Sequence, residues 1–340
     1  MGRLKELDSL RGIACIFVLL FHYTTRYSKL FNTELTINLV DVRFGGMGVD
    51  LFFIISGFVI FLTIKKTTTP SEFLYKRFSR LYPTFWICVF LTFFVVRSSD
   101  LIIYHRSFSE LFLNLSMVPG IFGVDRVDGV YWSLLPELAF YFLMFGLLLT
   151  KRTRSIDAIS FVWLLATLLN SYRDIMPLRV LFNLDFGYLF IIGISFYKIK
   201  IGEARWWNHL FIALSFLVSF LTREQAIERH YMTLVFIAVF YLFAYGKLKW
   251  IKLKPLIILG EISYALYLIH QFIGYVIINK LIKNGVENSI FLILIPSIIT
   301  IILAYAITFY IEKPIQLIMR NYFEKYRKNN ITFRTKYLKR

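Results

Sequence analysis

The chain has 340 residues, of which 58% are hydrophobic and 19% aromatic, and its mean hydropathy of +0.64 excludes a soluble domain. A formal charge of +18 could indicate nucleic-acid binding, but in so apolar a chain basic residues that hold cytoplasmic loops in place explain it better. Long unbroken apolar runs, in place of short alternating strands, predict an all-α polytopic integral membrane protein and not a transmembrane barrel.

These runs predict ten membrane-spanning helices, both chain ends on one side, and no internal repeat. We expect a transmembrane domain over 1–313 and a basic cytoplasmic tail over 314–340. The interior gap at 98–130 contains an apolar patch that predicts an amphipathic helix on the membrane surface. The predicted spans lie near residues 8–25, 46–64, 81–97, 131–150, 156–170, 178–197, 207–222, 230–246, 256–279 and 289–311.

The first span carries two ionisable side chains, Arg11 and His22. At about 100° and 1.5 Å per residue, they lie on one helical face and roughly 16 Å apart along the axis. Ionisable groups inside a span are costly and indicate function. The alternative is that Arg11 reaches lipid phosphates and His22 bonds a neighbouring carbonyl. Arg11 inside the run and the lack of an A-x-A site also argue against a cleaved signal peptide.

The distribution of basic residues predicts the orientation of the chain. With the N-terminus inside, the inner segments carry 26 Lys and Arg residues and the outer loops carry 12. Both termini are therefore expected in the cytoplasm. The strongly basic last thirty residues are expected to lie on anionic lipid headgroups.

This orientation gathers titratable groups in the outer part of the membrane, near His22. Asp50 begins the second span, Glu137 lies about 9 Å below the outer surface in the fourth, Asp185 lies in the sixth and His270 in the ninth. Each group alone is better explained by a buried structural hydrogen bond. Their shared depth favours a site.

Lys76, Arg77 and Arg80 fall in the turn expected to lead into the third span, at the inner surface. Arg77 and Arg80 are neighbours on one helical face because they are three residues apart. Two forked guanidinium groups side by side suit a phosphate or diphosphate. Ordinary anchoring of a cytoplasmic loop is the alternative interpretation.

The two cysteines, Cys15 and Cys88, both fall in apolar spans. They are expected to be small buried hydrophobic residues, and neither a disulfide nor a metal site is expected.

With these residues, the sequence resembles the bacterial membrane acyltransferase family 3, whose members O-acylate surface and exported carbohydrates. The resemblance covers nearly the whole chain and corresponds to the stand-alone form, without a C-terminal esterase-like domain. One departure is Pro136 before Glu137, which predicts a bend at the start of the fourth span. The motifs are LDSLRGIACIFVLLFHY with Arg-x10-His spacing, GGMGVDLFFIISGFVI, the Arg-x-x-Arg of YKRFSRLYP, WSLLPELAFYF, ISYALYLIHQ and IEKP at 311–314.

The resemblance implies an enzyme of the bacterial cytoplasmic (inner) membrane that uses no metal and binds no nucleic acid. Its donor would be a cytoplasmic acyl-CoA, acetyl-CoA by family frequency. Its acceptor would be a sugar hydroxyl at the outer face, in a surface polysaccharide such as O-antigen or exopolysaccharide or in a lipid-linked glycan. Lys76, Arg77, Arg80 and Arg11 would hold the CoA phosphates, and the long pantetheine arm would carry the thioester towards His22.

As a mechanistic hypothesis, His22 is the general base that takes the proton of the sugar hydroxyl as it attacks the thioester. Glu137 or Asp50 would orient its imidazole. Direct transfer and a route through an acylated His22 both stay open. The candidate donors to the developing oxyanion are Ser56, Trp132 and His270.

Two other classes of protein fit the composition. A multi-span transporter or flippase of a glycan or lipid-linked substrate also has buried charges, but the sequence shows no inverted repeat and its arginine pair lies at the surface. A non-catalytic scaffold or sensor gives Arg11 and His22 no reason to share a face.

Overall fold

The computed structural model of the protein describes residues 3–32, 42–221 and 227–337, with side chains up to 327. Within these ranges the chain forms α-helices and short 3₁₀ and π turns and contains no strand. Eight helical segments are long and apolar enough to cross a membrane. The protein is therefore an all-α polytopic membrane protein, as the sequence predicts.

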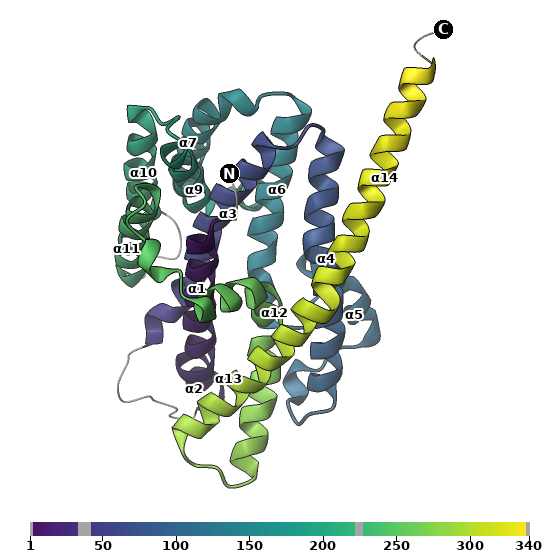
Figure 1. Cartoon of the computed structure of the whole chain (residues 1–340). Helices are drawn as coiled ribbons and strands as arrows, with labels where there is room; N and C mark the ends of the chain where they lie inside the picture. The colour runs from purple at the N-terminus through teal and green to yellow at the C-terminus, as the bar shows by residue number, and fades with distance from the viewer. Residues whose placement is uncertain (1–2, 33–41, 222–226, 338–340) are drawn as a thin grey trace.

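The helices follow one another in a single bundle, and Figure 1 shows their arrangement. Two π-helical turns, η1 and η8, continue α1 and α13 without a break in the helical path. The helices are α1 (Lys5–Phe21), η1 (His22–Arg26), α2 (Tyr27–Phe31), α3 (Gly48–Lys65), α4 (Pro70–Arg97), α5 (Phe108–Asn114), α6 (Leu134–Leu149), α7 (Ile156–Arg173), α8 (Met176–Leu181), α9 (Gly187–Lys200), α10 (Trp206–Ser219), α11 (Ile227–Ala244), α12 (Lys254–Lys283), α13 (Ser289–Ala306), η8 (Ile307–Glu312) and α14 (Lys313–Tyr337).

Each of the ten predicted spans contains a helix, but two of these helices, α9 and α10, have only 14 residues each. The sixth predicted span is divided between α8 and α9. The third was placed too late, because α4 begins at Pro70, where proline suits the first helical position and Thr69 caps the helix by accepting from the Glu72 N–H. The basic residues at 76–80 therefore lie within α4 and not in a turn.

Pro136 does not interrupt the fourth span. It lies in the first turn of α6, where a helix has no use for its missing N–H, and α6 runs on regularly to Leu149. Its carbonyl accepts a hydrogen bond from the Asn183 side chain at 3.1 Å. The predicted bend at the start of this span stays a prediction.

The interior gap contains a short helix, α5, between irregular segments. A capping box between Ser107 and Glu110 starts it, and Phe108 and Phe112 on its surface are exposed. Ile102 and Ile103 before it are three-quarters exposed. This apolar surface is the one expected to lie on the membrane, and that contact stays a prediction.

The helices α1 and α12 run parallel and pack closely. A Cβ on Gly260 would lie 1.8 Å from the carbonyl oxygen of Asp8, and a Cβ on Gly12 would lie 2.4 Å from that of Leu256. Only glycine permits this approach. The helices keep one register along their length: Cys15 meets Ser263 and His22 meets His270, each pair 248 residues apart. The glycines thus bring the two histidines together.

The predicted boundary at 313 coincides with the start of α14. This helix packs against α4 and then runs on past one end of the bundle, where it carries the C-terminus away from the other helices (Figure 1). The last three residues of the predicted tail lie outside the described residues, and the division into domain and tail stays a prediction.

Candidate active site

Three cavities follow one another through the bundle, and we name them after the predicted orientation. The inner cavity, 860 Å³, lies between α4 and α14; the middle cavity, 110 Å³, adjoins it; and the outer cavity, 560 Å³, is lined by His22. Arg11, Arg77 and Arg80 line both the inner and the middle cavity. Val49 and Tyr267 line both the middle and the outer one. Because they share lining residues, the three cavities are adjacent and form a series.

The inner cavity is strongly basic, and all four residues that the sequence assigns to phosphate binding line it. The Arg77 guanidinium lies over the rings of Phe73 and Tyr141 at 5.9 and 5.8 Å, and it forms no ion pair with a described residue. Stacking holds the group in place and leaves its charge available. Arg11 likewise has no acidic partner among the described side chains.

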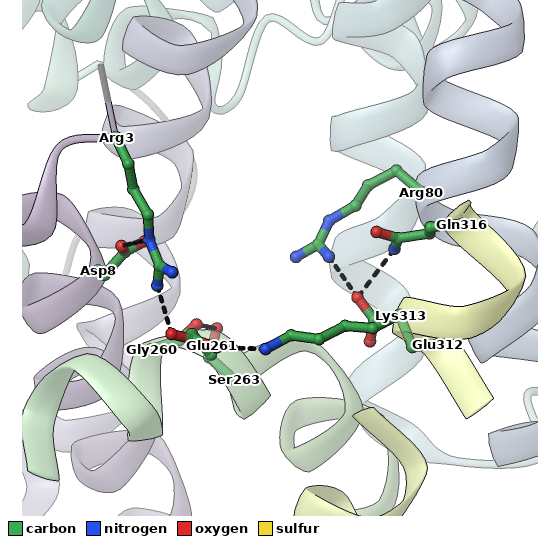
Figure 2. Close-up of polar contacts among 9 residues, drawn as sticks. All are labelled: Arg3, Asp8, Arg80, Gly260, Glu261, Ser263, Glu312, Lys313 and Gln316. Carbon is green, nitrogen blue, oxygen red and sulfur yellow. Dashed lines mark hydrogen bonds and ion pairs between the residues drawn. The ribbon is translucent and has the colours of Figure 1, made fainter. Parts of the chain in front are cut away.

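The other two of these four predicted phosphate-binding residues are held by carboxylates. Arg80 forms an ion pair with Glu312, which also accepts from Gln316, and Glu312 is almost fully buried (Figure 2). Lys76 pairs with Glu72 at 2.7 Å, one turn earlier on the same helix. Arg77 and Arg80 therefore differ in role although they share a face. Arg80 links α4 to the end of η8 through its ion pair, whereas the positive charge of Arg77 is available to bind an anion.

A second ionic network closes the inner end of the bundle beside this cavity. Arg3 bridges Asp8 and Glu261 at 2.6 Å each, and Lys313 pairs with the other oxygen of Glu261 (Figure 2). The network joins the start of α1, the second turn of α12 and the start of α14. It fixes the inner ends of the two helices that carry the histidines.

The middle cavity contains Glu137, which the sequence placed beside His22. Ser56 donates to a Glu137 carboxylate oxygen at 3.1 Å, and the Tyr141 hydroxyl donates to the same oxygen. Arg11, Arg77 and Arg80 line this cavity too. Glu137 therefore faces the arginines and not the imidazole, and the Ser56 hydroxyl is committed to it.

The outer cavity holds His22 together with Trp132, Tyr267 and Gln271. His22 begins the π turn η1, a helix irregularity that often marks functional sites. Trp132 packs against Phe186 with the ring centres 5.5 Å apart. The cavity is also lined by three arginines, Arg26, Arg43 and Arg229.

His22 and His270 form a hydrogen-bonded pair whose proton positions follow from their neighbours. His22 Nδ1 lies 2.8 Å from the Val18 carbonyl oxygen, and His270 Nδ1 lies 3.1 and 2.9 Å from the carbonyls of Leu266 and Tyr267. A ring nitrogen facing a carbonyl must carry hydrogen, so both Nδ1 atoms are donors. His270 Nε2, 3.2 Å from His22 Nδ1, is then an acceptor. The arrangement leaves His22 Nε2 as a proton acceptor.

Three side chains hold α12 around His270. Tyr23 donates to the His270 carbonyl at 2.7 Å, and Tyr131 donates to that of Leu268 at 3.1 Å. Asp128, fully buried before α6, accepts from the Phe272 N–H at 3.0 Å and the Val130 N–H at 3.1 Å. Burial raises the pKa of the Asp128 carboxyl to about 7, although these two hydrogen bonds act against the rise.

The two remaining carboxylates of the predicted outer cluster also lie apart from His22. Asp50 is fully buried, and its two carboxylate oxygens accept hydrogen bonds from the Arg229 guanidinium at 2.6 and 2.7 Å. Asp185 lies 3.6 Å from Arg179 and lines a small separate cavity of 60 Å³. In the described structure the partner of His22 is therefore a histidine, where the sequence suggested a carboxylate.

Sequence reasoning missed Arg26, Arg43, Arg229 and Asp128. Arg26 follows His22 by four residues, about one helical turn, so the same face argument that linked Arg11 to His22 could have found it. Arg229 opens a predicted span at the outer side, a position where an ionisable residue indicates function. Asp128 precedes the fourth span as a helix cap, and nothing in the sequence reveals that it reaches α12.

A family model described as an acyltransferase domain matches residues 4–309, nine-tenths of the chain. The chain belongs to this acyltransferase family. The resemblance seen in the sequence motifs is confirmed, and the match ends just before α14, whose residues lie outside the acyltransferase match.

Curated relatives of the chain include proteins from two bacteria. O-acetyltransferase OatA of Staphylococcus aureus, in strains NCTC 8325 and COL among others, is 26% identical over 92% of this chain. This chain spans 57% of the length of OatA. Protein 2 in picA locus of Rhizobium radiobacter is 33% identical over 90 residues, which are 25% of this chain and 41% of that protein. No solved structure matches the chain.

Proposed function

We propose that the protein is a membrane-bound O-acyltransferase that moves an acyl group, acetyl in the first instance, from cytoplasmic acyl-CoA to a sugar hydroxyl at the outer face. The acceptor is a surface polysaccharide, such as O-antigen or exopolysaccharide, or its lipid-linked precursor. The membrane is the bacterial cytoplasmic membrane. The observation that carries the proposal is the series of cavities, which joins unpaired arginines at one end to a histidine base at the other.

The donor end fits a long polyanion. Arg77 and Arg11 offer guanidinium groups without acidic partners among the described residues, and such groups bind phosphates with charge-assisted hydrogen bonds. The phosphates of CoA would stay in the inner cavity, and the pantetheine arm would enter the narrow middle cavity with the thioester leading. An activated acyl group would thereby cross the bundle without the CoA itself crossing.

The chemistry takes place at His22. The sugar oxygen attacks the thioester carbonyl, the new C–O bond forms, the C–S bond breaks, and His22 Nε2 accepts the hydroxyl proton and returns it to the leaving thiolate. His270 accepts from His22 Nδ1 and so holds the ring in the tautomer that leaves Nε2 free to act. His270 is thus a positioning residue and not an oxyanion donor, since its own N–H is bonded to carbonyls. Of the three oxyanion candidates, Trp132 alone lines the cavity of His22.

The name of the staphylococcal relative supports the acetyl group and transfer to oxygen. The second candidate function is a carrier, that is, a transporter or flippase of a glycan or lipid-linked substrate, because a series of cavities through a helix bundle also suits a transporter. The two differ in one respect: a carrier needs no base, whereas the transferase depends on His22.

The test is mass spectrometry of surface polysaccharide from cells that express the protein, the His22→Ala variant or a control. We expect an acetyl mass gain with the protein and none with His22→Ala, since a general base contributes roughly 10²- to 10⁴-fold. His209→Ala is the matched control, because His209 on α10 bonds Tyr241 away from the three cavities. His270→Ala should slow transfer, and His270→Gln, which keeps an acceptor, should recover part of it.

Acetyl transfer that persists in the membrane-inserted His22→Ala variant would contradict the base assignment. A glycan or lipid-linked sugar moved across the membrane, with no acyl gain on any glycan, would favour the carrier.

A further inference from the structure

The outer cavity carries more positive charge than a neutral sugar needs. Arg26, Arg43 and Arg229 all line it, and none of its lining residues, all in the described part of the chain, is acidic. Neutral sugars are bound by aromatic faces and amides, which Trp132 and Gln271 already supply in the same cavity. The arginines therefore need a separate explanation.

The three arginines are not equivalent. Arg229 is held by both oxygens of the buried Asp50 and lies over the Phe186 ring at 5.4 Å, so its charge is balanced and its orientation fixed. Arg26 and Arg43 are both exposed and both face the same cavity. Arg26 therefore brings to the cavity a positive charge that no described residue pairs with.

Of the three arginines, Arg26 lies closest in the sequence to His22, the proposed base. It ends the π turn that His22 begins, so about one helical turn, roughly 6 Å of rise, separates the two residues. Its guanidinium forms no ion pair or hydrogen bond with a described residue. An anionic group bound to Arg26 would lie in the same cavity as His22.

We propose that the acceptor of this enzyme is an anionic glycan, whose carboxylate or phosphate is bound by Arg26 while the hydroxyl beside it faces His22. The inference rests on the proposed function and adds the chemical class of the acceptor. Guanidinium forks recognise carboxylates and phosphates in two-bond geometry, and the positive cavity attracts such acceptors from solution. Trp132 is placed to contact the sugar ring.

The test uses the purified full chain in liposomes, acetyl-CoA and three probe acceptors: a hexuronic-acid oligosaccharide, its carboxyl-reduced neutral counterpart, and an oligomer of hexoses joined by phosphodiesters. We expect transfer to one or both acidic probes and little to the neutral one. Arg26→Gln should raise KM for the acidic probe roughly 10- to 100-fold, the effect of one lost charged hydrogen bond, with acetyl-CoA binding unchanged. The two acidic probes distinguish a carboxylate from a phosphate as the recognised group.

Lys29→Gln is the matched control. It removes the same charge one turn further along the same helical segment, at an exposed residue that does not line the outer cavity. Equal transfer to acidic and neutral probes, unchanged by Arg26→Gln, would overturn the anionic acceptor and leave the proposed function standing. A protein that neither binds acetyl-CoA nor acylates any probe would overturn the proposed function itself.

Discussion

At the scale of single residues, two arginines that look alike in the sequence have different surroundings. Arg77 lies over two aromatic rings and has no acidic partner among the described side chains, whereas Arg80 compensates the buried Glu312. The spacing of residues within one helix predicts which side chains share a face. It does not predict a contact with a carboxylate such as Glu312, which belongs to a helical turn more than two hundred residues away in the sequence.

Replacing these two arginines should therefore separate binding from stability. Arg80→Ala should lower the free energy of unfolding by roughly 2–4 kcal/mol, less than for a fully buried pair because Arg80 is partly exposed. Arg77→Ala should leave stability unchanged and weaken binding of acyl-CoA. The measurements are thermal unfolding in detergent and a CoA binding titration.

A second substitution serves as the control for Arg80. In Arg80→Ala with Glu312→Gln, the uncompensated charge is removed and most of the lost stability should return. Equal loss of stability in the single and double variants would show that the ion pair is not what Arg80 contributes.

At the scale of helices, the sequence places the apolar runs correctly and misplaces several ends. The start of α4 was missed because the basic residues of its first turns lower its hydropathy, although the Thr69 cap and Pro70 mark the true start. The π turn at His22 and the division of the sixth span depend on packing between helices, which periodicity does not contain. The meeting of His22 with His270 has the same origin, in the register of α1 against α12.

That register depends on the close approach at Gly260. Gly260→Ala would place a Cβ 1.8 Å from the Asp8 carbonyl oxygen, and the helices must then separate. We expect a loss of at least 1–3 kcal/mol in unfolding free energy and a fall in transfer activity, because the histidine pair is stretched. Gly146→Ala in α6, where nothing lies within 4 Å, is the control and should be neutral or slightly stabilising. An active and stable Gly260→Ala variant would mean that the helices can adjust.

Asp128 links the segment before α6 to the middle of α12 and should make stability depend on pH. Its folded pKa of about 7 lies above the value near 3.9 of an unfolded aspartic acid, so the folded protein holds the proton more tightly. Its contribution is fully present below about pH 4 and is lost as the pH rises through 7, by at most about 4 kcal/mol.

The comparison of wild type with Asp128→Asn isolates this effect. The amide keeps an oxygen to accept from the Phe272 N–H but does not ionise, so its unfolding temperature should fall less than that of the wild type between pH 5 and pH 8. Asp128→Ala, which leaves that N–H without its acceptor, should lose about 1–3 kcal/mol at every pH. Parallel pH profiles for wild type and Asp128→Asn would show that Asp128 does not titrate in this range.

At the scale of the whole molecule, composition and charge are sufficient to predict the class of protein, a polytopic membrane protein. They do not predict the cavities. The sequence predicts phosphate-binding residues at one side and a base at the other, and the structure places both on one series of cavities. It predicts no arginine at the outer end, because Arg26, Arg43 and Arg229 come from three segments that only the fold brings together. Glu137 shows the same limit: its depth was expected, but its direction, towards the arginines, was not.

The boundary between the middle and outer cavities, which the acyl group must cross in the proposed function, offers the sharpest test of this arrangement. Val49 on α3 lines both cavities, so Val49→Trp should fill the passage between them. The acyl group could then no longer reach His22, although the arginines of the inner cavity would still hold CoA. We expect CoA affinity within about twofold of the wild type and acyl transfer reduced by roughly 10²-fold or more, as for a misplaced reactant. Val49→Ala leaves the passage open and is the control. If Val49→Trp transferred acyl groups at the wild-type rate, the donor could not be reaching the base through the middle cavity.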